Sequence, residues 1–357
     1  MKSMKIIQDE SILIESGKNY CRKINDYYIK NILKFLMMFL FLFLIITQIK
    51  IINELKKNEK FFNENNCDKS KYDLKFKYHL YEKEAITEKM KKYSGWLMKS
   101  KEPYFINGII RRYKPKKCLE IGVAFGGSSI IILNAIKDIK DSFLVSLDLN
   151  SVILGKQAGY NAKKYFPELT NNNKWKLFTG KQPHKFLDKL NIKFDFLFLD
   201  TAHLVPGEII NLIEALPFLE ENAIIVLHDI MYHLQSKKFN YRPKEVKFHP
   251  APIYLFTSLA GYKVIMKEDG NKGVENIGAV FLHSNKEKYY LNYFLLLLTQ
   301  WEYMPPKNHI EELRAFIIKY YKNETLLLLF DKGVEENKIY INKFKKFKSI
   351  YKKCFQN

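Results

Sequence analysis

Cysteine is scarce in this chain. Its four cysteines, Cys21, Cys67, Cys118 and Cys354, form no C-x-x-C pair and no closely spaced framework. The sequence therefore predicts neither disulfides nor a cysteine-ligated zinc module. Cys118 begins an apolar run, which favours a buried small side chain over a nucleophile.

Acidic residues are outnumbered: 38 Asp and Glu face 59 Lys and Arg, for a formal net charge of +21. The lysines are spread over the whole chain, and the sequence has no zinc-finger pattern, RNP-like block or arginine cluster. This distribution favours a lysine-rich composition with no single polyanionic partner. An anionic membrane or an acidic substrate remains an alternative explanation of the charge, and nucleic acid is a minor one. The length of 357 residues accommodates a core domain with extensions at both ends.

The dinucleotide fingerprint G-x-G-x-x-G is also missing, although a glycine turn is present. In residues 118–129, CLEIGVAFGGSS, an apolar strand containing Glu120 is followed by Gly122, Gly126 and Gly127 and then by a helix-like run. Such a turn lets the backbone approach a ligand closely. A carboxylate two residues before the first glycine disfavours a pyrophosphate and suits a ligand that carries an ammonium group.

A second carboxylate supports an adenosine-containing ligand. Asp148 ends the next apolar run, residues 143–148, and follows Gly122 by 26 residues. A doubly wound fold places the acid that binds a ribose diol at about this distance.

Two later apolar runs also end in polar residues. Residues 193–203 contain Asp200 and His203, and residues 222–230 contain His228 and Asp229. The carboxyl ends of strands meet at one edge of an open α/β sheet, so these side chains should converge with Glu120 and Asp148.

The combined motifs, over about residues 100–284, resemble class I S-adenosylmethionine (SAM)-dependent methyltransferases of the O-methyltransferase branch. Glu120 to Ser128 matches E-x-G-x-x-x-G-x-S, and Asp200 to His203 matches D-x-x-H. The chain is similar there to macrolide and rhamnosyl O-methyltransferases and to the cephalosporin hydroxylase-like group. The resemblance implies SAM as cofactor and an oxygen of a small molecule or a lipid-linked glycan as methyl acceptor. It assigns cofactor binding to Glu120, Gly122, Gly126, Gly127, Ser128, Asp148, Thr179 and Gly180.

Alternating apolar and helical patterns predict an α/β fold, a Rossmann-like doubly wound sheet of seven strands, mostly parallel, with an antiparallel last strand. The expected strands lie near 117–121, 143–148, 175–179, 195–199, 223–228, 262–267 and 278–283. The expected helices lie near 82–99, 103–113, 127–138, 151–165, 183–190, 206–219 and 252–260.

Two routes to methyl transfer remain open at the sequence level. In one, His203 or His228 removes the acceptor proton, with Asp200 beside it. In the other, Asp200 and Asp229 hold Mg²⁺, but His228 and Ile230 stand where metal-dependent relatives carry Asn or an acid, so the oxygen triad is incomplete. The rival hypotheses are a hydroxylase with an iron site of His203, His228 and Asp200, and a membrane scaffold without activity.

The chain outside the core domain indicates a membrane protein. Residues 31–52 are predicted to be a single transmembrane helix, with the apolar run 35–46 at its centre, and the alternative is an interfacial or buried helix. The remaining divisions are a polar segment 1–30, a linker 53–80, the methyltransferase domain 81–284 and a helical extension 285–357. Because SAM is cytosolic in the family, the domain is expected on the cytoplasmic side.

The extension ends in lysines interleaved with aromatic residues. Tyr340, Phe344, Phe347 and Tyr351 fall on one face of a predicted basic amphipathic helix. That face suits either an anionic leaflet or the surface of the domain.

Overall fold

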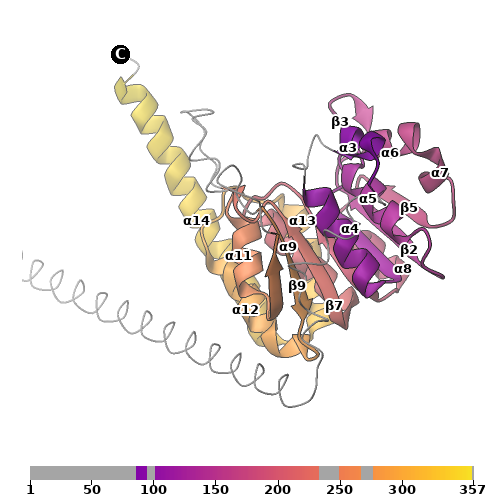
Figure 1. The fold of residues 1–357 in the computed structure, drawn as a ribbon. Coiled ribbons are helices and arrows are strands. Elements are labelled where there is room, and N and C mark those ends of the chain that lie inside the picture. Colours follow the sequence, from indigo (N-terminus) through magenta and orange to yellow (C-terminus); the bar gives the residue numbers. More distant parts are fainter. Residues whose placement is uncertain (1–85, 95–100, 233–248, 267–275, 356–357) are drawn as a thin grey trace, which may run out of the picture. The chain divides into compact units, whose positions relative to one another are not determined.

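The computed structural model describes residues 86–94, 101–232, 249–266 and 276–355, with side chains to residue 342 (Figure 1). Seven strands form one sheet in the order β5-β2-β1-β6-β7-β9-β8. The strands are β1 (Lys117–Ile121), β2 (Phe143–Asp148), β5 (Trp175–Thr179), β6 (Phe194–Leu199), β7 (Leu219–His228), β8 (Gly261–Ile265) and β9 (Ile277–Leu282).

The sheet is parallel except at one strand. Neighbours from β5 to β7 pair in parallel, whereas β9 pairs antiparallel with both β7 and β8. The predicted Rossmann-like sheet with an antiparallel last strand is therefore confirmed. Strands covered on both faces can be apolar without alternation, and β6, FDFLFL, has this character.

Helices cover both faces of the sheet. Phe196 and Phe198 of β6 belong to a core with α3 (Glu88–Ser94), α4 (Glu102–Tyr113) and α5 (Gly127–Ile136). Leu197 and Leu199 point into the opposite core. That core contains α8 (Pro183–Leu190), α9 (Gly207–Ala215), α11 (Ala251–Ser258) and the helices after residue 285.

The helix predicted for residues 151–165 is wrong over its first half. A hairpin of β3 (Val152–Ile153) and β4 (Lys156–Gln157) precedes the short helices α6 (Tyr160–Tyr165) and α7 (Pro167–Thr170). Leu154 at φ 47°, Gly155 at φ 76° and Gly159 at φ 75° adopt the left-handed conformation, which interrupts a right-handed helix.

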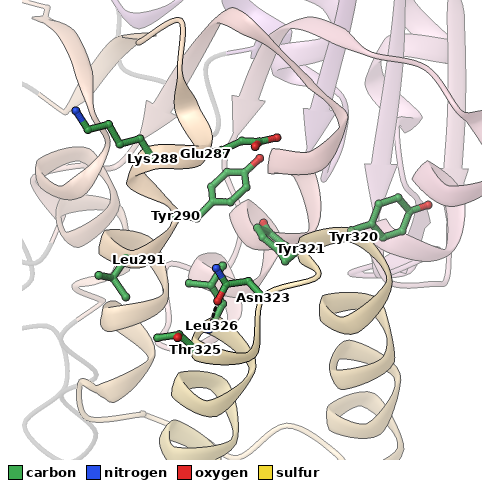
Figure 2. A pocket seen from close by; sticks show the side chains of 9 residues that line it. All are labelled: Glu287, Lys288, Tyr290, Leu291, Tyr320, Tyr321, Asn323, Thr325 and Leu326. Carbon is green, nitrogen blue, oxygen red and sulfur yellow. Dashed lines mark hydrogen bonds between the residues drawn. The ribbon is translucent and has the colours of Figure 1, made fainter.

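The helices of the C-terminal extension complete the second core. They are η4 (Lys286–Tyr289), α12 (Tyr290–Leu295), η5 (Leu296–Leu298), α13 (Lys307–Tyr321) and α14 (Glu324–Phe355). Trp301 is 1 % exposed and donates its indole N–H to the Leu297 carbonyl at 2.8 Å. A cleft of about 430 Å³ lies between these helices, and none of the predicted site residues lines it (Figure 2).

The predicted membrane helix 31–52 lies outside the described residues. Within the described part of the chain, every helix is too short or too polar to cross a bilayer. The predicted basic tail is helical as far as Phe355 in α14. Its aromatic residues from Phe344 onward lie beyond the described side chains.

Candidate active site

Four neighbouring strands bring the predicted polar residues to one edge of the sheet. The Asp200 N–H donates to the Ile121 carbonyl at 3.0 Å, and the Gly122 N–H donates to the Leu147 carbonyl at 2.9 Å. These bonds join the ends of β1, β2 and β6, and β7 pairs alongside β6. The predicted convergence at the carboxyl edge is thus what the structure shows, while the roles of the individual residues stay predictions.

The glycines of the turn allow the protein's own backbone to approach closely. Gly122 has φ +92°, and a Cβ there would lie 1.7 Å from the Asp200 carbonyl oxygen. Gly126 has φ +88°, and its Cβ would lie 2.9 Å from the Cβ of Ala162. A Cβ at Gly127 would come within 3.2 Å of Ser94 Cα. Larger residues would displace the turn itself, so these glycines shape the site whatever ligand it takes.

Asp148 fastens the glycine turn to the end of β2. Its Oδ2 accepts hydrogen bonds from the N–H groups of Val123 and Ala124, both at 2.9 Å, and its Oδ1 accepts one from the Asn150 N–H at 2.8 Å. Thr179 is its register partner on β5, and the Gly180 N–H donates to the Asp148 carbonyl at 3.0 Å. Asp148 therefore positions the turn, and binding of a ribose would add to this structural role.

Glu120 and Ser128 bond to each other beneath the turn instead of facing an open cleft. Glu120 is 0 % exposed, and its carboxylate accepts hydrogen bonds from the hydroxyls of Ser128 at 2.5 Å, Ser129 at 2.6 Å and Ser146 at 2.5 Å. The expected direct contact between Glu120 and a ligand ammonium does not fit this burial. Burial raises the pKa of Glu120 to about 7 against the opposing effect of the three hydroxyls.

The raised pKa of Glu120 predicts a pH-dependent stability. The folded state keeps the proton up to about pH 7, whereas the unfolded carboxyl loses it near 4.5, so the stability from this group falls as pH rises between these values. Over that window the loss amounts to about 3 kcal/mol. We expect Glu120→Gln to lack this decline. The unfolding free energy of the variant should therefore rise relative to that of the wild type between about pH 4.5 and pH 8.

Urea unfolding at several pH values measures the difference. Glu168→Gln, at an exposed position, is the matched control and should follow the wild-type curve. Parallel pH dependences for Glu120→Gln and the wild type would contradict the raised pKa.

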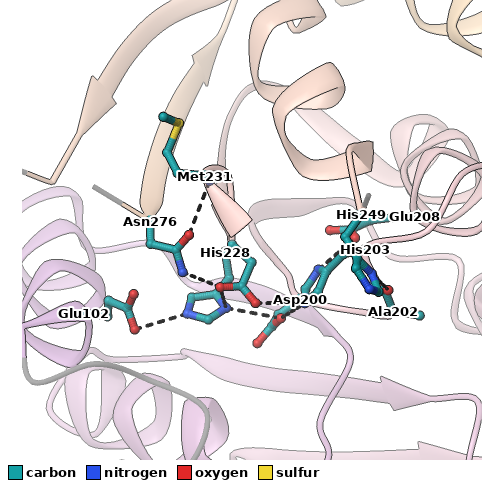
Figure 3. A network of polar contacts seen from close by, with 10 residues as sticks. Glu102, Asp200, Ala202, His203, Glu208, His228, Met231, His249 and Asn276 are labelled. Atoms are coloured by element: carbon teal, nitrogen blue, oxygen red, sulfur yellow. Dashed lines mark hydrogen bonds and ion pairs between the residues drawn. The ribbon is translucent and has the colours of Figure 1, made fainter. Parts of the chain in front are cut away.

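His203 lies at the centre of a polar network at the ends of β6 and β7 (Figure 3). Its Nδ1 is 3.1 Å from Glu208 Oε2, on the first turn of α9. Its Nε2 is 3.0 Å from Asp229 Oδ2 and 3.6 Å from Asp200 Oδ1. Glu208 thus fixes the ring, and the two aspartates face its other nitrogen.

His228 occupies the buried side of the same network. It is 2 % exposed, with Nε2 3.2 Å from Glu102 Oε2 and Nδ1 3.3 Å from Asp200 Oδ1. Asn276, which immediately precedes β9, donates from Nδ2 to Asp229 Oδ1 and accepts the Met231 N–H at 3.3 Å. The aspartates are therefore held from both sides.

The carboxylates control protonation in the network. Burial favours the neutral imidazole, but Glu208, Asp229 and Asp200 outweigh it and raise the pKa of His203 well above its usual value. Asp200 and Asp229 raise the pKa of His228 in the same way. Burial opposes ionisation of Asp229, yet His228 and His203 hold its pKa to about 2. The carboxylates therefore favour the charged form of both imidazoles.

Three donors of the network suit a divalent cation. Ligand atoms of Asp200, His203 and Asp229 all lie within 4.8 Å of one another. The sequence offered two oxygen ligands, Asp200 and Asp229, and the structure adds the imidazole of His203 as a third donor. A cation bound there would replace the proton on His203 Nε2. Ile230 is fully buried in the core, and His228 is turned toward Glu102.

Sequence reasoning missed Glu102, Glu208 and Asn276. Glu208 follows His203 by five residues, so a search for acids near the motif could have found it. Glu102 and Asn276 contact the network from elements 126 and 47 residues distant from their partners, and no local pattern identifies them.

Two aromatic side chains surround the exposed side of His203. Ring centroids are 5.7 Å apart for His203 and Tyr232, 6.4 Å for His203 and His249, and 5.2 Å for Tyr232 and His249. Both belong to the segment that connects β7 to α11. Residues 233–248 of that segment lie outside the described part of the chain.

The model of one protein family, described as a methyltransferase domain, matches residues 119–230. A search of curated proteins found no match. Among solved structures, similar ones include the SAH-bound methyltransferase PaMTH1 of Podospora anserina, at 17% identity and a TM-score of 0.41, which covers 55% of this chain and 88% of its own. The O-methyltransferase TomG of Streptomyces achromogenes in complex with SAM has 16% identity, a TM-score of 0.42 and coverages of 56% and 90%. An O-methyltransferase of Bacillus cereus in complex with SAH has 16% identity, a TM-score of 0.40 and coverages of 55% and 91%.

Proposed function

We propose that this chain, whose residues 119–230 form a methyltransferase domain, transfers a methyl group from SAM to a hydroxyl of a small-molecule or glycan acceptor. The observation that carries the proposal is the adjacency of two structures at the sheet edge. A Cβ at Gly122 would overlap the Asp200 carbonyl, so the turn fastened by Asp148 directly adjoins the network around His203. A methyl donor on the turn would meet an acceptor hydroxyl at the network.

The reaction demands alignment and the loss of one proton. The acceptor oxygen attacks the methyl carbon, the carbon–sulfur bond breaks, and the hydroxyl proton must leave. Glu208 holds the His203 ring, and Asn276 and His228 hold the two aspartates, so the residues that receive the hydroxyl are fixed before it binds. Preorganisation of this kind lowers the barrier because little reorientation remains.

We infer that a divalent cation completes the site. Asp200, His203 and Asp229 would hold it, and it would lower the pKa of a hydroxyl bound to it. The geometry favours this route over base catalysis by His203, because both nitrogens of that ring already face carboxylates.

Chelation tests this inference together with the reaction. We expect label from methyl-labelled SAM to pass to hydroxyl-bearing acceptors, and we expect dialysis against EDTA to remove most of the transfer. Added Mg²⁺ or Mn²⁺ should restore it. Full transfer after chelation would contradict the metal and leave His203 as the base. Absence of transfer to every acceptor, together with absence of SAM binding, would contradict the function.

The acceptor we propose contains a ring with hydroxyls, such as a sugar. Tyr232 and His249 place aromatic rings beside His203, and aromatic rings pack well against the apolar side of a sugar ring. A lipid-linked glycan would agree with the apolar run at residues 35–46 and with the net charge of +21.

Membrane attachment through residues 31–52, with the domain on the cytoplasmic side, is part of this proposal. We expect the full chain to sediment with membranes and a chain lacking residues 1–53 to stay in the supernatant, because the apolar run would be gone. If the shortened chain still sediments with membranes, the basic tail of α14 and not residues 31–52 attaches the protein to the membrane.

A further inference from the structure

Three helices bring a second group of metal-ligating side chains together, and this group shares no residue with the network around His203. His184 lies on the first turn of α8, Glu214 lies near the end of α9, and His309 lies on the first turn of α13. His184 Nδ1 is 2.5 Å from Glu214 Oε1, and His309 Nε2 is 3.9 Å from the same oxygen. Ligand atoms of all three residues lie within 4.8 Å of one another.

Two atoms of this group are buried and lack a hydrogen-bond partner. Glu214 is 0 % exposed and its Oε2 accepts no hydrogen bond, and His309 Nε2 is equally enclosed without one. A buried carboxylate oxygen and a buried ring nitrogen each lose the hydrogen bonds that water would supply. Because His309 Nε2 lies 3.9 Å from the other oxygen of the Glu214 carboxylate, a single partner that accepts electron pairs from both side chains would satisfy them together.

The surroundings do not supply that partner. Among the described residues, the basic groups that pair with Glu214 are only His184 and His309. The charged neighbours include Glu312, whose Oε1 pairs with Lys185 at 2.8 Å and whose field acts on both histidines. Tyr303 and Tyr321 lie near Glu214, and Phe316 packs on His184 with centroids 5.6 Å apart. The group is thus rich in electron-pair donors and poor in cations.

We propose that His184, Glu214 and His309 bind a divalent transition-metal ion of the zinc type. Zn²⁺ binds imidazole nitrogen and carboxylate oxygen at about 2.0–2.2 Å, which places donors roughly 3.2–3.5 Å apart around a tetrahedron. The close pair at 2.5 Å must open and the pair at 3.9 Å must close, each by less than about 1 Å, which side-chain rotation permits. Two imidazoles select zinc over Mg²⁺, which prefers oxygen donors.

The ion would have a structural consequence. The His309 side chain is 17 % exposed although its Nε2 is buried, so this ring separates the group from solvent. The three ligands come from two helices of the sheet domain and from α13 of the extension, so the ion fastens the extension to the domain. Zinc binding at such a site stabilises the folded chain in proportion to its occupancy.

The experiment uses the full chain in detergent, stripped with chelator and then given Zn²⁺. To remove the other donor group, the background carries His203→Gln and Asp229→Asn. We expect elemental analysis to find about one zinc per chain and the melting temperature to rise by roughly 5 to 10 °C at a hundredfold excess over Kd. Adding His309→Gln should abolish both effects, and His283→Gln, at a histidine outside the group, should leave both intact. Mg²⁺ should produce neither.

Two outcomes overturn the proposal: no bound zinc in the background chain, or zinc and melting temperature unchanged by His309→Gln. If the background chain does not fold, the same zinc analysis on the otherwise unmodified chain decides. There, His309→Gln must lower the zinc content by about one ion per chain relative to His283→Gln, and equal contents refute the site.

Discussion

Asp148→Ala is expected to weaken SAM binding at least about 100-fold. The substitution removes two hydrogen bonds that hold the glycine turn, from Val123 and Ala124, as well as the acceptor proposed for the ribose hydroxyls. Hydrogen bonds to a charged group contribute about 1.5–3 kcal/mol each, and about 1.4 kcal/mol corresponds to a factor of ten in affinity. Even two such bonds therefore account for the expected loss.

Calorimetric titration of the full chain with SAM measures this effect. A separate titration with NAD tests whether the site binds a dinucleotide instead. The control is Asp138→Ala, which removes an exposed acid at the end of α5 and should leave the affinity unchanged. Asp148→Asn should fall between the two, because its amide oxygen still accepts hydrogen bonds without the charge. Wild-type affinity for SAM in Asp148→Ala would refute the role of this residue.

His203→Ala should lower kcat by about two to four orders of magnitude while SAM affinity stays near that of the wild type. The imidazole lies between Glu208 and Asp229 and is one of the three ligands of the proposed cation, so its loss would leave the acceptor hydroxyl less acidic. Such a cation contributes several kcal/mol of transition-state stabilisation, and about 1.4 kcal/mol corresponds to a factor of ten in rate. Asp229→Asn should act at the same step. Because Glu208 only orients the ring, Glu208→Gln should cost less than either.

Single-turnover kinetics with bound SAM separate chemistry from binding. His283→Gln serves as the matched histidine control. A normal single-turnover rate in His203→Ala would remove this residue from the mechanism, and a loss of SAM affinity equal to the loss of rate would show a collapsed site instead.

The sequence contained enough information to place the strand ends because their pattern is local. β2 and β6 are short apolar runs, with Asp148 as the last residue of β2 and Asp200 directly after β6. Parallel strands share one carboxyl edge, so the convergence followed from topology alone. The conformation of Leu154 did not follow, because a left-handed non-glycine residue has no reliable sequence pattern.

Contacts between residues far apart in the chain could not be predicted from the sequence for a different reason. Glu120 looked like a ligand-facing acid until three serine hydroxyls, one of them on β2, were found around it. Glu102 and Asn276 reach the network only because α4 and β9 pack beside it. The apolar residues of the extension, such as Trp301, predicted helices but not that they would complete the core of the sheet domain.

The insertion of β9 between β7 and β8 has a consequence for biosynthesis. A ribosome releases β8 before β9, yet β9 is the strand with which β8 pairs, and Asn276 reaches Asp229 from the residue just before β9. A growing polypeptide that ends before Leu282 therefore has neither a finished sheet nor a fully supported Asp229. Synthesis must therefore pass Leu282 before the sheet can close, and fragments that end before this residue should be inert.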